Sequence, residues 1–161
     1  MDSLMKGRKW QSAGISGDRT QNVLWRIQNG GYEKGDPQTI TIAIGINNLT
    51  AGDSPKEVTG GIIACANAAS IQYPNATIIL SGLLPAGLEA DNPLRMKYNG
   101  VQQALRSAAG GFPTNVKYVD PTGWFVGSDG TLKADLYGGD HLHLSDKGYK
   151  VWGEIIAGLL K

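Results

Sequence analysis

The sequence is poor in the residues that build disulfides and metal sites. It has one cysteine and two histidines in 161 residues. A disulfide framework needs several cysteines, so this chain has none. Cys65 lies in the helical-looking run GIIACA (61–66), where a small core residue is a better interpretation than a nucleophile. With so few ligands, a closed metal site is not expected.

The sequence also lacks an excess of charge of either sign, and it has no long apolar runs. The formal net charge is +1, and acidic and basic residues are interspersed. This pattern gives no electrostatic footprint for nucleic acid or an anionic membrane. No apolar run approaches the length of a membrane span, and residues 1–6 lack a signal-peptide apolar region. We therefore expect a small neutral substrate, no nucleic-acid partner, no membrane span and, if this N-terminus is the natural one, a cytoplasmic location.

The length and the pattern of the chain indicate one α/β domain. With 161 residues, 41% of them apolar, the chain can bury one continuous core over residues 1–161. Short β-branched runs predict strands at 39–45, 76–81 and 116–120, and longer periodic segments predict helices at 20–29, 55–72, 94–109 and 146–160. This alternation favours a parallel sheet with helices on both faces, a three-layer α/β/α sandwich. Active sites in such sheets form at the carboxyl ends of the strands.

The GGDHLHLS segment near the C-terminus contains both histidines. Asp140 precedes His143 by three positions, and such an acid can hold an imidazole in one tautomer as a general base. Two other interpretations stay open for this segment alone. Asp140, His141 and His143 could bind a metal ion, or the segment could be a turn before the last helix, capped by Ser145 or Asp146.

Two further polar blocks lie where strands should end. GISGD (14–18) precedes the first helix, and its glycines allow a turn with free backbone N–H groups. GINN (45–48) follows a strand, and an asparagine there offers an uncharged amide donor. Each block alone is an ordinary turn. Together, a backbone N–H and an asparagine amide are what an acyl-transfer enzyme needs to stabilise an oxyanion.

With these blocks in place, the sequence resembles the SGNH, or GDSL-type, ester hydrolases. Within them it is similar to the branch that contains the alpha subunits of intracellular platelet-activating factor acetylhydrolase and related bacterial acetylesterases. The matching stretches keep the family's order: GISGD (14–18), TQNVLWRIQN (20–29), IGINN (44–48), LLP (83–85) and DHLHL (140–144). The resemblance implies a flavodoxin-like parallel sheet.

The resemblance also implies roles for individual residues. Gly17 would contribute a backbone N–H and Asn47 a side-chain amide to the oxyanion hole, while His143 would be the general base and Asp140 its orienting acid. It is the resemblance that chooses between the two neighbouring histidines and between the two neighbouring asparagines.

The activity implied is hydrolysis of a short acyl ester, acetyl above all, through an acyl-enzyme and without metal or cofactor. The substrate would be a lipid, a carbohydrate or a small-molecule ester. The loops expected to contact its alcohol part, 85–93 and 126–137, carry no specificity signal. Relatives often pair as dimers, so a homodimer is an expectation from the resemblance alone.

The family's nucleophile is the serine of a Gly-Asp-Ser motif that follows the first strand. Residues 1–3 read MDS, which makes Ser3 the candidate nucleophile. A sheet of order 2-1-3-4-5 places its first strand between the second and third, and its loss would leave ladder groups unpaired. Since no strand precedes Ser3, we expect the natural domain to begin further upstream.

A second serine, Ser54, belongs to a complete GDS tripeptide (52–54). Pro55 and Glu57 follow it in the pattern of a helix capping box, so we interpret Ser54 as a cap. Three alternatives remain for the nucleophile. It is Ser3, it lies upstream, or the chain is a non-catalytic binding or scaffold domain that keeps the fold.

Overall fold

The computed structural model describes residues 7, 9–32 and 35–160. In this part of the chain the strands β1 (Thr39–Ile42), β2 (Thr77–Ser81) and β3 (Val116–Val119) form one parallel sheet in the order β1-β2-β3. Ile40 lies opposite Ile78 in the first pair, and Ile78 lies opposite Val116 in the second. The parallel sheet predicted from the sequence is confirmed. Within the described residues the three strands pair with no gap between them.

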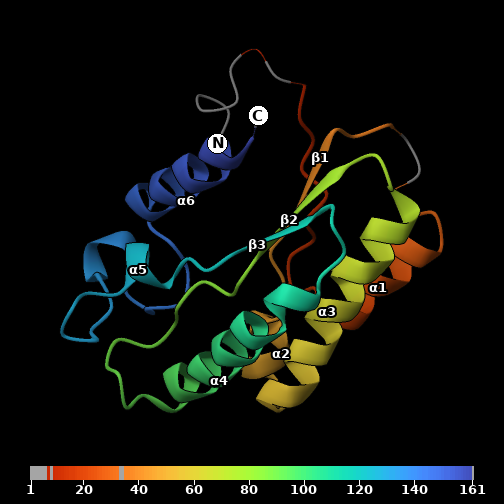
Figure 1. The fold of residues 1–161 in the computed structure, drawn as a ribbon. Helices are drawn as coiled ribbons and strands as arrows, with labels where there is room; N and C mark the ends of the chain where they lie inside the picture. The colour runs from red at the N-terminus through yellow and green to blue at the C-terminus, as the bar shows by residue number, and fades with distance from the viewer. Residues whose placement is uncertain (1–6, 8, 33–34, 161) are drawn as a thin grey trace.

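Helices cover both faces of the sheet (Figure 1). Helices α1 (Thr20–Gln28), α2 (Ile46–Thr50), α3 (Pro55–Gln72) and α4 (Pro93–Ala108) lie on one side, and α5 (Thr122–Phe125) and α6 (Asp146–Leu159) lie on the other. Two short 3₁₀ turns, η1 (Ala109–Gly111) and η2 (Ala134–Leu136), complete the described elements. The three-layer arrangement agrees with the sequence prediction.

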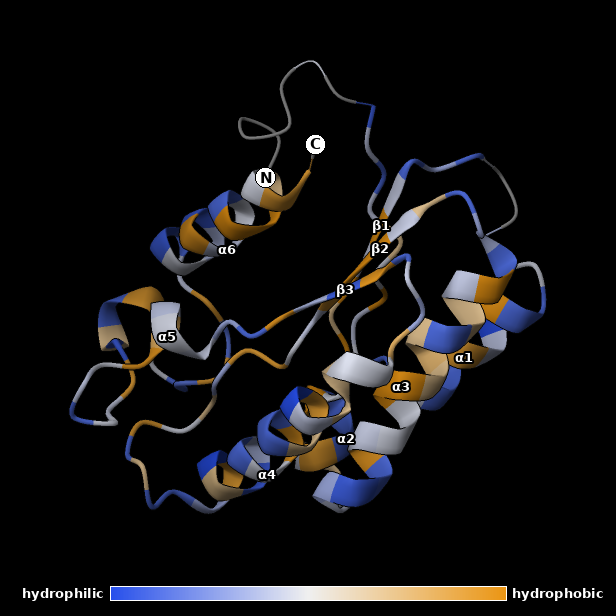
Figure 2. Ribbon diagram, in the orientation of Figure 1, coloured by the Kyte–Doolittle hydropathy of each residue, from blue (hydrophilic) through white to orange (hydrophobic). Residues whose placement is uncertain are grey.

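The central strand β2 divides the interior into two apolar clusters. Ile78 and Leu80 pack into the cluster under α1, α3 and α4, whereas Ile79 packs into the cluster under α6. All three side chains are fully buried, which is why this strand reads as a continuous apolar run rather than an alternating one. The strands are correspondingly apolar in Figure 2.

Helix α3 begins as the sequence predicts. The Ser54 hydroxyl accepts a hydrogen bond from the backbone N–H of Glu57 at 3.3 Å, and the Glu57 carboxylate accepts one from the backbone N–H of Ser54 at 2.8 Å. This reciprocal pair is a capping box. The interpretation of Ser54 as a helix cap is therefore confirmed.

Helix α2 was not expected, because the GINN block had been predicted as a turn. Gly45 ends the connection from β1 with φ of 120°, a backbone conformation that favours glycine. A Cβ at this position would also lie 2.9 Å from Cγ1 of Val58. The glycine lets the chain leave the strand and enter a helical turn at once, directly against α3.

Candidate active site

Asp140 and His143 form the most direct polar contact among the residues proposed for catalysis. Oδ2 of Asp140 lies 2.6 Å from Nδ1 of His143, and Oδ1 accepts hydrogen bonds from the backbone N–H groups of Leu142 and His143, both at 3.0 Å. The hydrogen bond to the His143 side chain, followed by those from the two backbone groups, holds the pKa of the Asp140 carboxyl well below its usual range.

An ionised carboxylate on Nδ1 fixes the imidazole tautomer that has a free lone pair on Nε2. The His143 side chain is 75% exposed, so this nitrogen is accessible to a reacting group. Such a contact is one in which a carboxylate can orient an imidazole for proton transfer.

The loop around this pair, residues 138–143, is held by its own backbone. Gly138 N–H donates to the carbonyl of His143 at 2.8 Å, and His141 N–H donates to the carbonyl of Gly138 at 3.0 Å. His141 has a φ of 51°, which a residue other than glycine adopts only when its surroundings impose it. Its Nδ1 is buried and makes no hydrogen bond, so the two histidine side chains lie in different environments.

At a second place, Asn47 of α2 contacts the turn that contains Gly17 and precedes α1. Nδ2 of Asn47 donates to the carbonyl of Asp18 at 2.8 Å. An amide nitrogen carries two hydrogens, so one remains available for a ligand. Gly17 is exposed with φ of 82°, and within the described residues nothing accepts its N–H. A Cβ at Gly17 would have no neighbour within 4 Å, so the space beside this turn is open.

Asn48, beside Asn47, has a structural role that the sequence did not reveal. Its side chain is buried, and its Oδ1 accepts the first backbone N–H of α1, from Thr20, at 2.9 Å. Its Nδ2 donates to Gln21 at 3.1 Å and to Asp53 at 2.8 Å. Asn48 thus ties α1 to α2 and sets the distance between the Gly17 turn and Asn47. The paired asparagines in GINN were the only signal of this division of roles.

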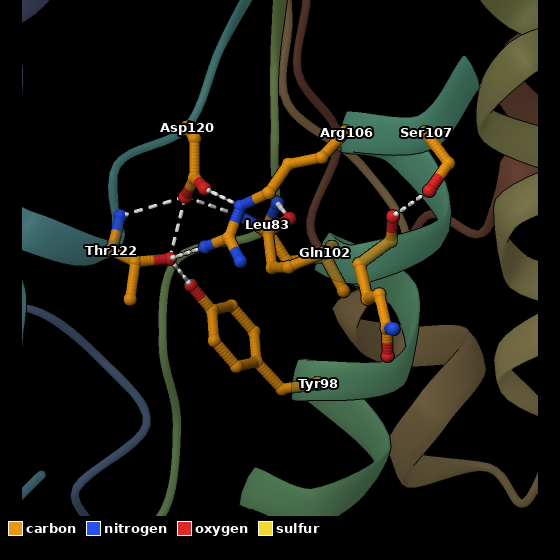
Figure 3. Close-up of polar contacts among 8 residues, drawn as sticks. Leu83, Tyr98, Gln102, Arg106, Ser107, Asp120 and Thr122 are labelled. Carbon is orange, nitrogen blue, oxygen red and sulfur yellow. Dashed lines mark hydrogen bonds and ion pairs between the residues drawn. The ribbon is translucent and has the colours of Figure 1, made fainter. Parts of the chain in front are cut away.

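A polar cluster fixes the carboxyl ends of β2 and β3 against α4 (Figure 3). Gln102, buried in α4, accepts a hydrogen bond from Leu83 N–H at 3.1 Å and donates to Asp120 at 2.7 Å. Asp120 also accepts the Thr122 N–H at 3.0 Å and forms an ion pair with Arg106. Burial raises the pKa of Asp120, but the hydrogen bonds from Thr122 and Arg106 outweigh it, and the pKa lies below its ordinary value. The Asp120 carboxylate thus helps to hold the ends of β2 and β3 against α4.

The remaining candidate, Ser3, lies outside the described residues. In the part of the chain that the structure describes, no hydrogen bond joins the pair Gly17 and Asn47 to the pair Asp140 and His143. The same residues contain no group of three or more His, Cys, Asp or Glu side chains that could hold a metal ion. None of the described helices has the length and apolar character needed to cross a membrane.

Comparison with known proteins identifies the family of the chain. The chain matches the model of the GDSL-like lipase/acylhydrolase family over residues 2–151. It is 42% identical over 137 residues to the alpha1 subunit of platelet-activating factor acetylhydrolase IB from Bos taurus and from Homo sapiens. These alignments cover 84% of this chain and 56% and 57% of the relatives, so the chain spans a little over half of their length.

Solved structures share the fold. A GDSL-like lipase from Bacteroides thetaiotaomicron superposes with a TM-score of 0.78 at 20% identity, over 98% of this chain and 78% of the other. A member of the lipolytic protein G-D-S-L family from Veillonella parvula superposes with a TM-score of 0.74 at 17% identity, over 99% and 84%. At such identities the likeness concerns the fold alone, and the sequence match carries the assignment. The chain belongs to the GDSL-like lipase/acylhydrolase family.

Proposed function

We propose that this protein is a serine ester hydrolase that removes short acyl groups. The observation that carries the proposal is the contact between Asp140 and His143, in which both carboxylate oxygens are engaged and Nε2 of the imidazole is left accessible. The family assignment supports ester hydrolysis as the reaction class.

In the proposed mechanism a serine hydroxyl attacks the ester carbonyl while Nε2 of His143 takes its proton. The tetrahedral oxyanion is stabilised by Gly17 N–H, the free amide hydrogen of Asn47 and the N–H of the nucleophile. The protonated His143 then gives its proton to the departing alcohol, leaving an acyl-serine. A water molecule attacks the acyl-serine, His143 accepts its proton, and return of that proton to the serine releases the carboxylic acid.

We assign the nucleophile to Ser3 and the preferred acyl group to acetyl. Ser3 is the serine of the incomplete MDS motif at the start of the chain. The acetyl preference is supported by the names of the relatives, which are acetylhydrolases. The alcohol part would belong to a lipid, a carbohydrate or a small-molecule ester.

The test is the intact mass of the chain after exposure to a fluorophosphonate, together with hydrolysis of para-nitrophenyl acetate. We expect one adduct that maps to Ser3, turnover of the ester, and loss of both in Ser3→Ala. Ser54→Ala is the matched control, because Ser54 also follows an aspartate, in a complete Gly-Asp-Ser tripeptide, but caps a helix. It should keep the adduct while losing about 1 kcal/mol of stability.

Labelling that survives Ser3→Ala would refute the assignment of the nucleophile but not the reaction class. The absence of both adduct and turnover would contradict the proposal for this chain. It would favour a nucleophile encoded upstream, or a domain that binds esters or carboxylates without cleaving them.

A further inference from the structure

Arg95 is the most deeply buried charged side chain among the described residues, with 2% of its surface exposed. It lies in the first turn of α4, and its guanidinium forms none of the ion pairs found in the described part of the chain. Burying an unpaired charge is costly unless every donor finds an acceptor. The hydrogen-bond acceptors around the guanidinium must therefore compensate for the burial of its charge.

The acceptors of Arg95 are three backbone carbonyl oxygens. Nε donates to Ala86 at 3.1 Å, Nη2 to Gly87 at 2.6 Å and Nη1 to Gly130 at 3.1 Å. The planar guanidinium also lies over the ring of Tyr98, 6.0 Å from its centroid. Only a rigid fork with several donors can reach three carbonyls at once, which distinguishes arginine from lysine here.

These carbonyls belong to two loops that are far apart in the sequence. Ala86 and Gly87 lie in the β2–α4 loop (residues 82–92), and Gly130 lies in the α5–η2 loop (residues 126–133). A single backbone hydrogen bond, from Leu132 N–H to the Leu88 carbonyl at 2.9 Å, also joins the two loops. Arg95 thus supplies a second polar link between the two loops, with two hydrogen bonds to the β2–α4 loop and one to the α5–η2 loop.

The β2–α4 loop in turn holds the loop of the proposed general base. Gly87, whose carbonyl accepts from Arg95, donates its own N–H to the carbonyl of His141 at 2.9 Å. His141 is the residue with the left-handed backbone, two positions before His143. One residue, Gly87, therefore separates the buried guanidinium from the loop that presents the imidazole.

We propose that Arg95 is a positioning residue that locks the β2–α4 and α5–η2 loops together and, through Gly87, sets the orientation of His143 on Asp140. It does not touch the substrate. The inference rests on the proposed function for its kinetic consequence, but its structural consequence can be measured without any turnover.

The first readout is the low-field proton NMR signal of the hydrogen bond between His143 Nδ1 and Asp140. Asp140→Ala identifies this signal by removing it. We expect Arg95→Met, which keeps the volume and removes the donors, to broaden or abolish the signal. Lys97→Met is the matched control, because Lys97 is a cation of the same helix that makes no hydrogen bond to the described residues of either loop, and it should keep the signal.

The second readout is turnover of para-nitrophenyl acetate by variants that circular dichroism shows to be folded. We expect kcat to fall roughly 10- to 100-fold in Arg95→Met, as for a base displaced by about 1 Å, with a smaller change in KM. Arg95→Lys should recover only part of the loss. In Arg95→Ala, added ethylguanidinium should restore both the NMR signal and kcat, and ethylammonium should not.

If Arg95→Met does not fold, Gly87→Ala tests the same link. Gly87 has φ of 84°, and a Cβ there would lie 2.6 Å from the Asn92 side chain, so the alanine must displace the loop. Gly35→Ala, at a positive φ but with no neighbour within 4 Å, is its control. An unchanged NMR signal in the folded Arg95 and Gly87 variants would overturn the inference. A wild-type protein that shows the signal without turnover would instead count against the proposed function alone.

Discussion

Two adjacent glycines on α3, Gly60 and Gly61, should respond in opposite ways to the same substitution. A Cβ at Gly60 would have nothing within 4 Å. A Cβ at Gly61 would lie 2.3 Å from Oγ1 and 2.7 Å from Cβ of Thr20, at the start of α1. The pair thus reports on the packing of α1 against α3, which positions the Gly17 turn.

The expected magnitudes follow from helix propensity and from overpacking. Alanine is favoured over glycine in a helix interior by about 1 kcal/mol, so Gly60→Ala should stabilise the fold by that amount. Gly61→Ala gains the same propensity but must displace Thr20. Thr20 is buried, and both its N–H and its carbonyl are hydrogen-bonded, the latter to Cys65 Sγ at 3.3 Å. Overpacking of about 3 kcal/mol leaves a net loss of about 2 kcal/mol.

Thermal and urea unfolding of the two variants would measure this difference. A gap of about 3 kcal/mol corresponds to roughly 6–12 °C in Tm for a domain of this size. Adding Thr20→Gly to Gly61→Ala opens the space again, so the double variant should be more stable than the sum of the single effects. Equal stability of Gly60→Ala and Gly61→Ala would refute the close approach of α1 to α3.

Three further predictions concern the site and its supports. Asn48→Asp places a carboxylate against Asp53 and removes the amide donor, so it should lower the free energy of unfolding by about 2–3 kcal/mol. Adding Asp53→Asn should restore most of this stability. Additive effects of the two substitutions in thermal unfolding would contradict the contact between the two side chains. Burial raises the pKa of Cys65 to about 11, so the native thiol should resist a disulfide reagent at pH 8 and react only in denaturant; prompt reaction of the folded protein would count against its burial. His143→Ala should lower turnover of para-nitrophenyl acetate by about 10³-fold or more, and His141→Ala should lower it much less. Equal losses in the two variants would favour the interpretation that the segment binds a metal ion. Elemental analysis of the purified protein would then test for the metal.

The layers of the fold were predictable because the apolar pattern follows directly from burial. The run at 76–81 has three consecutive apolar residues at its centre, since Ile78, Ile79 and Leu80 face helices on both sides, and the structure places β2 there with a difference of one residue. Capping chemistry is equally local, so Ser54 was interpreted correctly from the residues that follow it.

The supports of the site were not predictable, because they depend on contacts between distant segments. Nothing around Arg95 in the sequence signals that its partners are carbonyls 8, 9 and 35 positions away. Asn48 likewise looks equivalent to Asn47 until the fold brings Thr20 against it. The contact between Asp140 and His143 was expected because three positions of sequence already bring acid and base together.

The division of the interior by β2 has a consequence for how the protein opens. Adjacent residues of one strand belong to different apolar clusters, so neither helical layer can detach without exposing part of the same strand. The amide hydrogens of β2 should therefore exchange with solvent only when the whole molecule unfolds, while those of the outer helices report smaller openings. Because β2 contributes to both apolar clusters, the two clusters should unfold together.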